Sequence, residues 1–231
     1  MTAGLYVIGK LFRFEATRRV GGGYDGHSFV AEIVLSAAEL TKVGFVTDFG
    51  DLAPLKTYID ATLDHQMLSD VLDDASDEGI ADHLYQWGAA NLPDSARPFL
   101  EAVRVRTGRT AARVGTASAV DFEASHRLDG LAEGHPCGRL HGHSYLLALN
   151  AGPGRAARAV GVPVVLRRYI QSTLAGALLN DVLSFNPTCE LLAEHIGIWL
   201  CDRRPAGVPG QTTVRVSETE TSWAEYPVRS A

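Results

Sequence analysis

Four residues whose side chains bind metals or transfer protons lie close together in the second half of this 231-residue chain: His126, Cys137, His141 and His143. His141 and His143 are two residues apart, so on a strand their side chains point to the same face of the sheet. His126 ends an apolar run that suits an antiparallel partner of that strand. Three imidazoles that converge in this way can hold one tetrahedral metal ion and leave its fourth position open, which is typical of catalytic zinc.

Cys137 precedes His141 by four residues, on the predicted connecting loop, where its thiol can reach a substrate held by the metal. A His-x-His pair alone is weak evidence, because isolated histidines are usually surface or core residues. The added His126 and Cys137 at this spacing favour a metal site. His135 is close enough in sequence to tune the reactivity of the Cys137 thiol. The alternative interpretation is that His135 is a solvent-exposed loop residue.

The composition is that of an ordinary globular protein, with 46% hydrophobic and 21% charged residues. No apolar run reaches the ~18 residues that cross a bilayer, and no signal peptide is visible. Three scattered cysteines do not suggest a disulfide framework, and a reducing cytoplasm would keep Cys137 a free thiol. The net charge of −6 argues against general nucleic-acid binding. We therefore expect a cytoplasmic protein with neither a membrane nor a nucleic-acid partner.

The two halves of the chain resemble each other, which predicts an internal duplication. The corresponding stretches are 14–19 with 122–127, 25–29 with 141–145, and 68–72 with 179–183. The offset between them varies from 108 to 116 residues, as expected when two copies differ in loop length. We predict two domains of one fold, residues 1–112 and 113–231.

Each half has the same predicted order of elements: two strands, two helices and two closing strands, or ββααββ. The strands are rich in β-branched and aromatic residues, and helix 49–63 has its apolar residues on one stripe. Asp48, Ser76 and Thr188 are suitable N-caps. The remaining predicted helices are 76–88, one that begins near Pro163, and 188–202. The predicted strands are 4–16, 27–38, 103–107, 117–126, 143–151, 212–219 and 223–228, and 108–116 is either a further strand or the linker.

This α+β unit has helices on one face of an antiparallel sheet and leaves the sheet edges exposed. Exposed edges are a liability unless they are paired. Two units contain too few strands to close a barrel. We therefore expect a homo-oligomer in which several units close a β-barrel.

Several runs of residues resemble the 6-pyruvoyl-tetrahydropterin synthase family. They are 48–52, 63–65, 122–126, 137–143, 186–190 and 214–219. The three residues between Cys137 and His141 match the spacing of the 6-carboxytetrahydropterin synthase branch, which belongs to the queuosine and 7-deazapurine pathway. The resemblance covers nearly the whole chain and implies two tandem tunnelling-fold (T-fold) units.

The resemblance also implies roles for particular residues. The implied zinc ligands are His126, His141 and His143, the implied catalytic thiol is Cys137, the implied Asp-His pair of the catalytic triad is Asp64 with His65, and the implied pterin anchor is Glu218. The pair and the thiol come from different halves.

Each half lacks what the other keeps. The second half has Leu174-Ala175-Gly176 where the Asp-His pair belongs. The first half has Arg18 and Asp25 in place of two zinc-ligand histidines, and only His27 remains. Complementary loss of this kind favours one composite active site per chain over random decay.

Some of these positions have a second interpretation. Asp64-His65, taken alone, is better explained as a helix C-terminus, where a histidine suits the helix dipole. Glu190 is a rival to Glu218 as the anchor, although its place after Asn-Pro-Thr suits the first turn of a helix. Cys189 and Cys201 are interpreted as small core residues.

The implied activity is that of a zinc-dependent 6-carboxy-5,6,7,8-tetrahydropterin synthase-like lyase acting on 7,8-dihydroneopterin triphosphate. The alternative within the same class is a 6-pyruvoyl-tetrahydropterin synthase. A second alternative, from a different functional class, is a pterin- or purine-binding protein without turnover. Retention of both Cys137 and Asp64-His65 favours turnover, because a binding protein has no need of them.

Overall fold

The computed structural model describes residues 6–107, 119–152 and 158–228. The chain forms two compact units. The N-terminal unit comprises residues 9–36 and 47–112, and the C-terminal unit comprises residues 1–8, 37–46 and 113–231. Two segments of the first half of the sequence, 1–8 and 37–46, therefore belong to the C-terminal unit. The expected domain boundary at 112/113 stays a prediction, because it lies outside the described residues.

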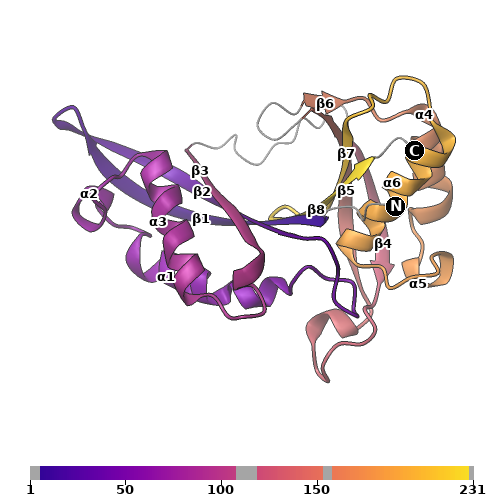
Figure 1. The fold of residues 1–231 in the computed structure, drawn as a ribbon, viewed down its shortest axis with the longest axis horizontal. Coiled ribbons are helices and arrows are strands. Elements are labelled where there is room, and N and C mark those ends of the chain that lie inside the picture. The colour runs from indigo at the N-terminus through magenta and orange to yellow at the C-terminus, as the bar shows by residue number, and fades with distance from the viewer. Residues whose placement is uncertain (1–5, 108–118, 153–157, 229–231) are drawn as a thin grey trace. The chain divides into compact units, whose positions relative to one another are not determined.

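The N-terminal unit is a three-stranded sheet in the order β3-β2-β1, with helices α1 and α3 on one face (Figure 1). Its elements are β1 (Tyr6–Val20, whose first three residues count with the other unit), β2 (Gly23–Ala37), a 3₁₀ turn (Phe49–Leu52), α1 (Ala53–Thr62), α2 (Leu68–Val71), α3 (Asp77–Asn91), a second 3₁₀ turn (Arg97–Phe99) and β3 (Leu100–Thr107). Gly21 and Gly22 both have positive φ, so they form the tight turn that two-residue hairpins favour.

The C-terminal unit is an antiparallel sheet in the order β8-β7-β5-β4 with its helices on one side (Figure 1). Its elements are β4 (Val120–His126), a 3₁₀ turn (Pro136–Gly138), β5 (His141–Ala151), β6 (Arg158–Val160, paired with β5), α4 (Val164–Tyr169), a π-helical turn (Ile170–Leu174), α5 (Leu179–Val182), α6 (Cys189–Arg203), β7 (Thr212–Thr219) and β8 (Ser222–Val228). The first residues of β1 lie next to β8, where the ring of Tyr6 is 5.4 Å from that of Tyr226.

The two halves make equivalent packing contacts. Tyr58 stacks on Trp87 between α1 and α3, and Tyr169 stacks on Trp199 between α4 and α6. The hydroxyl groups of the same tyrosines lie close to a histidine on the second helix. Tyr58 Oη is 2.6 Å from His83 Nε2, and Tyr169 Oη is 2.7 Å from His195 Nε2. The duplication seen in the sequence is therefore a duplication of the fold.

The predicted fold class is confirmed: each unit combines an antiparallel sheet with helices on one face. The three N-caps are also confirmed, since the side chains of Asp48, Ser76 and Thr188 accept hydrogen bonds from backbone N–H groups. The predicted helix 49–63 begins as a 3₁₀ turn, and the α-helix starts at Ala53 beside Pro54. The short elements α2, α5 and β6 were not predicted, because three or four residues give no periodicity.

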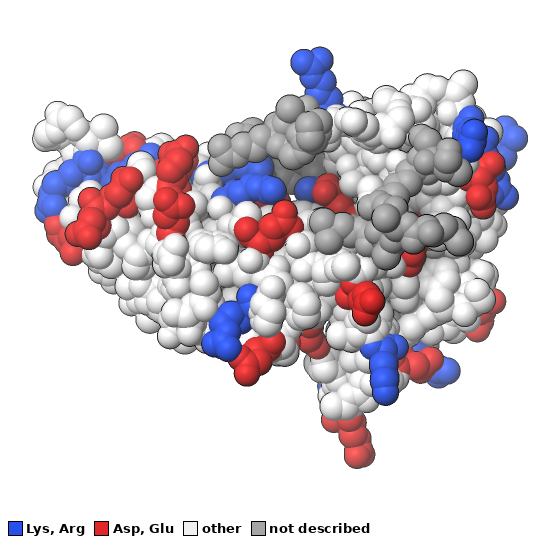
Figure 2. Space-filling view, in the orientation of Figure 1, with Lys and Arg blue, Asp and Glu red and all other residues white. Residues whose placement is uncertain are grey.

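Neither unit closes its sheet into a barrel, so the barrel and the oligomer stay predictions. The stretch 108–116 lies outside the described residues. Within the part of the chain that the structure describes, no helix is both long and apolar enough to cross a membrane. On the face in Figure 2, basic and acidic side chains are intermingled. The described residues on that face form no extended basic surface.

Candidate metal centre and active site

Three histidines meet at one end of the β4–β5 pair. His126 is paired with His141 across the two strands, and Ala124 is paired with His143. The predicted antiparallel pairing is therefore confirmed. One nitrogen from each of the three rings lies within 4.8 Å of the others. The period-2 geometry of the strands brings the rings to one face of the sheet.

Two of the rings are held by backbone carbonyl groups. His126 Nδ1 is 2.8 Å from the carbonyl oxygen of Pro187, and His141 Nδ1 is 2.7 Å from that of Arg139. A carbonyl can only accept, so Nδ1 carries the hydrogen in both rings. The Nε2 lone pairs of both rings are consequently free, and they face each other at 3.1 Å.

This arrangement fits a bound zinc ion. Two lone pairs at 3.1 Å repel each other unless a cation lies between them. Tetrahedral zinc with nitrogen ligands at about 2.0–2.1 Å places those nitrogens roughly 3.3 Å apart. Carbonyl acceptors on the outer ring nitrogens are the usual support for metal-binding histidines. The cluster of His126, His141 and His143 can therefore hold a metal ion.

Burial keeps two of the imidazoles neutral. His126 is 1% exposed, and burial lowers its pKa. Burial, together with the charges of the other two histidines, lowers the pKa of His143 to about 4. A neutral imidazole is the form that binds metal. These two side chains therefore need no deprotonation at neutral pH.

The cysteine loop, which we define as residues 127–140, connects β4 to β5 and holds Cys137 in a 3₁₀ turn. Cys137 is half-buried, and its sulfur takes part in no disulfide bond within the described residues. Its backbone N–H donates to His135 Nδ1 at 3.1 Å, and its carbonyl accepts from Leu128 N at 2.9 Å. His135 thus caps the turn that presents the thiol.

Glu218 lies on β7, half-buried, near the histidines. Residue Ser217 pairs with Leu146 on β5, which places Glu218 close to Tyr145. Burial and then the charge of Glu218 raise the pKa of Tyr145, whose ring lies 5.5 Å from that of His143. The structure therefore brings Glu218, the histidine cluster and the cysteine loop together in one unit.

Glu190, the rival anchor, lies in the first turn of α6 as expected. It is 3% exposed, and its Oε1 accepts a hydrogen bond from Val46 N at 3.1 Å. Cys189 is a buried core residue whose thiol donates to Val216 O, whereas Cys201 is half-buried. These contacts give Glu190 and Cys189 structural roles.

Asp64 and His65 form a hydrogen-bonded pair on the surface of the N-terminal unit. His65 Nδ1 is 2.8 Å from Asp64 Oδ2, and the His65 side chain is 78% exposed. The Glu15 N–H donates to Asp64 Oδ1, and this bond, with that to His65, lowers the pKa of Asp64. The carboxylate orients the imidazole and leaves Nε2 pointing outward. The pair and the cluster belong to different units, so their joint action stays a prediction.

The equivalent position in the C-terminal unit is hollow. Gly176 stands where the first half has His65, and a cavity of about 220 Å³ is lined by Gly176, Glu123, Ser144 and the β4–β5 backbone up to His143. A Cβ placed on Gly176 would have nothing within 4 Å, so the cavity is open at this residue.

The N-terminal unit has an arginine where the C-terminal unit has its first histidine ligand. Arg18 donates to Asp25 at 3.1 Å and to Asp77 at 2.9 Å, and His27 Nε2 lies 2.7 Å from Asp25. The guanidinium is 15% exposed and lies over the ring of Phe29. A cation carried by the chain therefore occupies the position that corresponds to the metal site.

The family description "6-pyruvoyl tetrahydropterin synthase" matches the chain twice, over residues 8–118 and 115–228. The chain belongs to this family. Its members are lyase-type enzymes. The two matches correspond to the tandem repeat, so the first half is a pterin synthase unit that lacks two of the three histidines.

Two solved structures are similar to this pterin synthase-family chain. One is the 6-pyruvoyl tetrahydropterin synthase of Caenorhabditis elegans, 14% identical, with a TM-score of 0.39, covering 47% of this chain and 99% of that one. The other is an uncharacterized protein from Wolinella succinogenes, 20% identical, with a TM-score of 0.26, covering 96% of this chain and 98% of that one.

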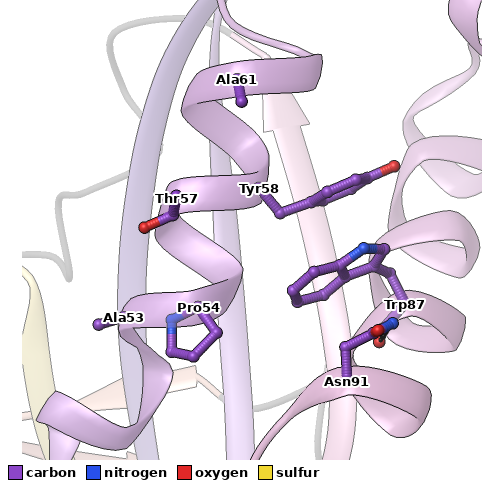
Figure 3. Close-up of a pocket in the computed structure, with 7 residues that line it drawn as sticks. All are labelled: Ala53, Pro54, Thr57, Tyr58, Ala61, Trp87 and Asn91. Atoms are coloured by element: carbon purple, nitrogen blue, oxygen red, sulfur yellow. Dashed lines mark hydrogen bonds between the residues drawn. The ribbon is translucent and has the colours of Figure 1, made fainter.

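A groove between α1 and α3 lies apart from the histidine cluster, in the N-terminal unit. It has a volume of about 640 Å³, and Figure 3 shows the stacked rings of Tyr58 and Trp87 beside Asn91. None of its seven lining residues is an acid, a histidine or a cysteine. In the C-terminal unit, Arg203 covers the equivalent Trp199 at 4.5 Å. The residue of the groove that corresponds to this arginine is Asn91.

Sequence reasoning missed one group of residues at the site. Asn186 contacts both the cysteine loop and segment 37–46. The Asn-Pro-Thr motif that contains it is part of the family resemblance and precedes the first turn of α6. Its partners are distant in sequence, so no local signal predicts them.

Proposed function

We propose that this protein is a zinc-dependent 6-carboxy-5,6,7,8-tetrahydropterin synthase-like lyase that acts on 7,8-dihydroneopterin triphosphate. The observation that carries the proposal is the cluster of His126, His141 and His143, with two Nε2 lone pairs 3.1 Å apart, in the same unit as a loop that contains a cysteine. The spacing of Cys137 and His141 favours the queuosine-pathway branch. The 6-pyruvoyl-tetrahydropterin synthase activity is the alternative.

Each polar residue has a proposed task. The Glu218 carboxylate accepts two hydrogen bonds from the amino-pyrimidinone edge of the pterin, which are directional and charge-assisted. The Cys137 thiol, on its 3₁₀ turn, exchanges a proton at a side-chain carbon of the substrate. His65, oriented by Asp64, exchanges that proton with the thiol, following the logic of catalytic triads. Zinc, when bound, would supply Lewis-acid polarisation of the side-chain hydroxyl groups.

The pair and the thiol lie in different units, and we propose that they serve one composite site per chain. Family membership of both halves and the complementary losses support this. The hollow at Gly176 and the ion pair at Arg18 mark the two positions where one half lacks the group that the other keeps. We further propose that two tandem T-fold units, with the boundary near 112/113, assemble into a homo-oligomeric β-barrel.

The test is incubation of zinc-loaded protein with 7,8-dihydroneopterin triphosphate and identification of the pterin product by mass. The expected product is 6-carboxy-tetrahydropterin, with acetaldehyde as the second product. A 6-pyruvoyl product selects the alternative activity. Tight pterin binding with no product over many hours selects the binding protein and overturns the lyase.

A further inference from the structure

Two asparagine side chains hold the first residues of the cysteine loop. Asn180 accepts from Arg127 N at 3.0 Å and donates to Arg127 O at 2.9 Å. Asn186 accepts from Asp129 N at 3.0 Å and donates to Asp129 O at 3.1 Å. Each carboxamide therefore pairs with one residue's backbone as a neighbouring strand would. The loop is fixed immediately after His126.

Asn186 makes one more hydrogen bond, which Asn180 lacks within the described structure. Its Nδ2 donates to the carbonyl oxygen of Val43 at 2.7 Å. The amide nitrogen has two hydrogens, so it can serve Asp129 O and Val43 O together. Val43 belongs to segment 37–46, which comes from the first half of the sequence and lies in the C-terminal unit.

Buried hydrogen bonds hold segment 37–46 against the start of α6. The Thr188 hydroxyl donates to Gly44 O at 2.9 Å, and Val46 N donates to the Glu190 carboxylate at 3.1 Å. Gly44 has a φ of 100°, and a Cβ there would lie 2.6 Å from Leu191 Cδ1. Alanine at this position would have a strained backbone and would press on the Leu191 side chain, so Gly44→Ala should loosen the segment.

The other side of the segment faces the cysteine loop. A Cβ placed on Gly130 would lie 3.6 Å from Val43 Cγ2, which is ordinary contact distance. Segment 37–46 therefore lies between the start of α6 and the loop that presents Cys137. Asn186 is bonded to both neighbours at once.

We propose that Asn186 is a positioning residue that couples segment 37–46 to the cysteine loop, so that the first half of the chain helps to place Cys137. The catalytic meaning of this coupling rests on the proposed function, because Cys137 is the proposed thiol. The coupling itself is a property of the fold and can be measured without turnover.

Hydrogen exchange of the full chain tests the coupling, with Asn180→Ala as the matched control. Loss of a hydrogen bond that protects a local structure raises exchange by about tenfold. We expect Asn186→Ala to raise exchange in both 37–46 and 127–140, and Asn180→Ala to raise it in 127–140 only. An Asn186→Ala pattern confined to 127–140, like that of the control, overturns the proposal.

Gly44→Ala tests the same coupling by a change in segment 37–46 instead of a change at Asn186. It should raise exchange in 127–140 although no residue of that loop is changed. In both variants, peptide-resolved alkylation of Cys137 by iodoacetamide should become several-fold faster, because a half-buried thiol gains access. Unchanged hydrogen exchange in 127–140 of Gly44→Ala would contradict the coupling. This result decides the question even if Asn186→Ala fails to fold.

The kinetic test separates positioning from substrate binding. Asn186→Ala should lower kcat by at least about tenfold, because it removes all three hydrogen bonds of this side chain and the loss of a single one corresponds to about tenfold, with KM within twofold because Glu218 is untouched. The combined loss in Asn186→Ala/Gly44→Ala should be smaller than the product of the two losses. A raised KM with unchanged kcat contradicts the positioning role. If the wild-type chain has no turnover, the proposed function fails while the exchange and alkylation results still decide the coupling.

Discussion

His65 and Gly176 occupy equivalent positions in the two units, and both have a positive φ, 57° and 73° respectively. His65 N donates to Glu15 O, and Gly176 N donates to Glu123 O. A non-glycine residue in this region is strained by roughly 1 kcal/mol or more. The first half therefore keeps a histidine where its own backbone favours glycine.

Replacement of His65 separates activity from stability. His65→Ala retains the strained backbone and His65→Gly relieves it, so His65→Gly should be the more stable variant by about 1 kcal/mol. Both variants should lose turnover. Thermal unfolding and pterin assays check this. Gly176→Ala is the matched control and should be destabilised by a similar amount; equal stability of the two His65 variants would argue against strain.

The split triad predicts non-additive losses. Cys137→Ala and His65→Ala should each lower kcat on the order of 10²–10⁴-fold, while the metal content stays unchanged. Because groups that act as one unit are not additive, the double variant should be little worse than either single variant. Steady-state kinetics with 7,8-dihydroneopterin triphosphate measure all three. Near-normal turnover of His65→Ala would falsify the composite site and leave the metal site untouched.

Metal stoichiometry distinguishes the two units. We expect one zinc per wild-type chain and none in His141→Ala/His143→Ala. In Arg18→His/Asp25→His, the N-terminal unit regains three histidines with His27, and the zinc content should rise to two. Arg18→Lys, which keeps a cation in place, should remain at one. Elemental analysis after dialysis measures the number of zinc ions per chain. A second zinc in Arg18→Lys would show that a cationic side chain at position 18 does not exclude the metal.

The stability of the C-terminal unit should depend on pH through His195. Burial and the charge of Arg203 lower its pKa, and its Nε2 is 2.7 Å from the Tyr169 hydroxyl. The unfolded chain therefore binds this proton more readily, and stability is fully present above about pH 6.5 and is lost as the pH falls through the lower folded pKa.

Urea unfolding at pH 7 and pH 5, with a chelator to exclude metal effects, measures this dependence. His195→Gln should narrow the difference in unfolding free energy between the two pH values. His83→Gln removes the equivalent tyrosine contact in the other unit and serves as the reference. A His195→Gln variant with the full wild-type pH dependence would refute the assignment.

The cluster of three histidines could be predicted from the sequence because the residues that form it lie on two neighbouring strands and their faces follow from local spacing. The spacing of His141 and His143 on one strand, with His126 on the partner strand, fixes the side-chain face through the pleat. N-caps were predictable for the same reason, since each side chain bonds to a backbone two or three residues on.

Contacts between residues that are distant in the sequence could not be predicted from it. Asn186 bonds to Val43 across 143 residues, and Arg18 bonds to Asp77 across 59. The loss of a ligand at Arg18 was visible in the sequence, whereas the second carboxylate that balances the guanidinium was not. Pairings of this kind depend on the topology of the whole unit, which no local pattern encodes.

The guanidinium of Arg18 is part of the polypeptide, so it is made at translation and cannot dissociate or be removed by a chelator. The N-terminal unit therefore reaches its folded form whatever the metal supply of the cell. Removal of metal ions should therefore leave this half folded, whereas an ion held by His126, His141 and His143 can be lost from the other half.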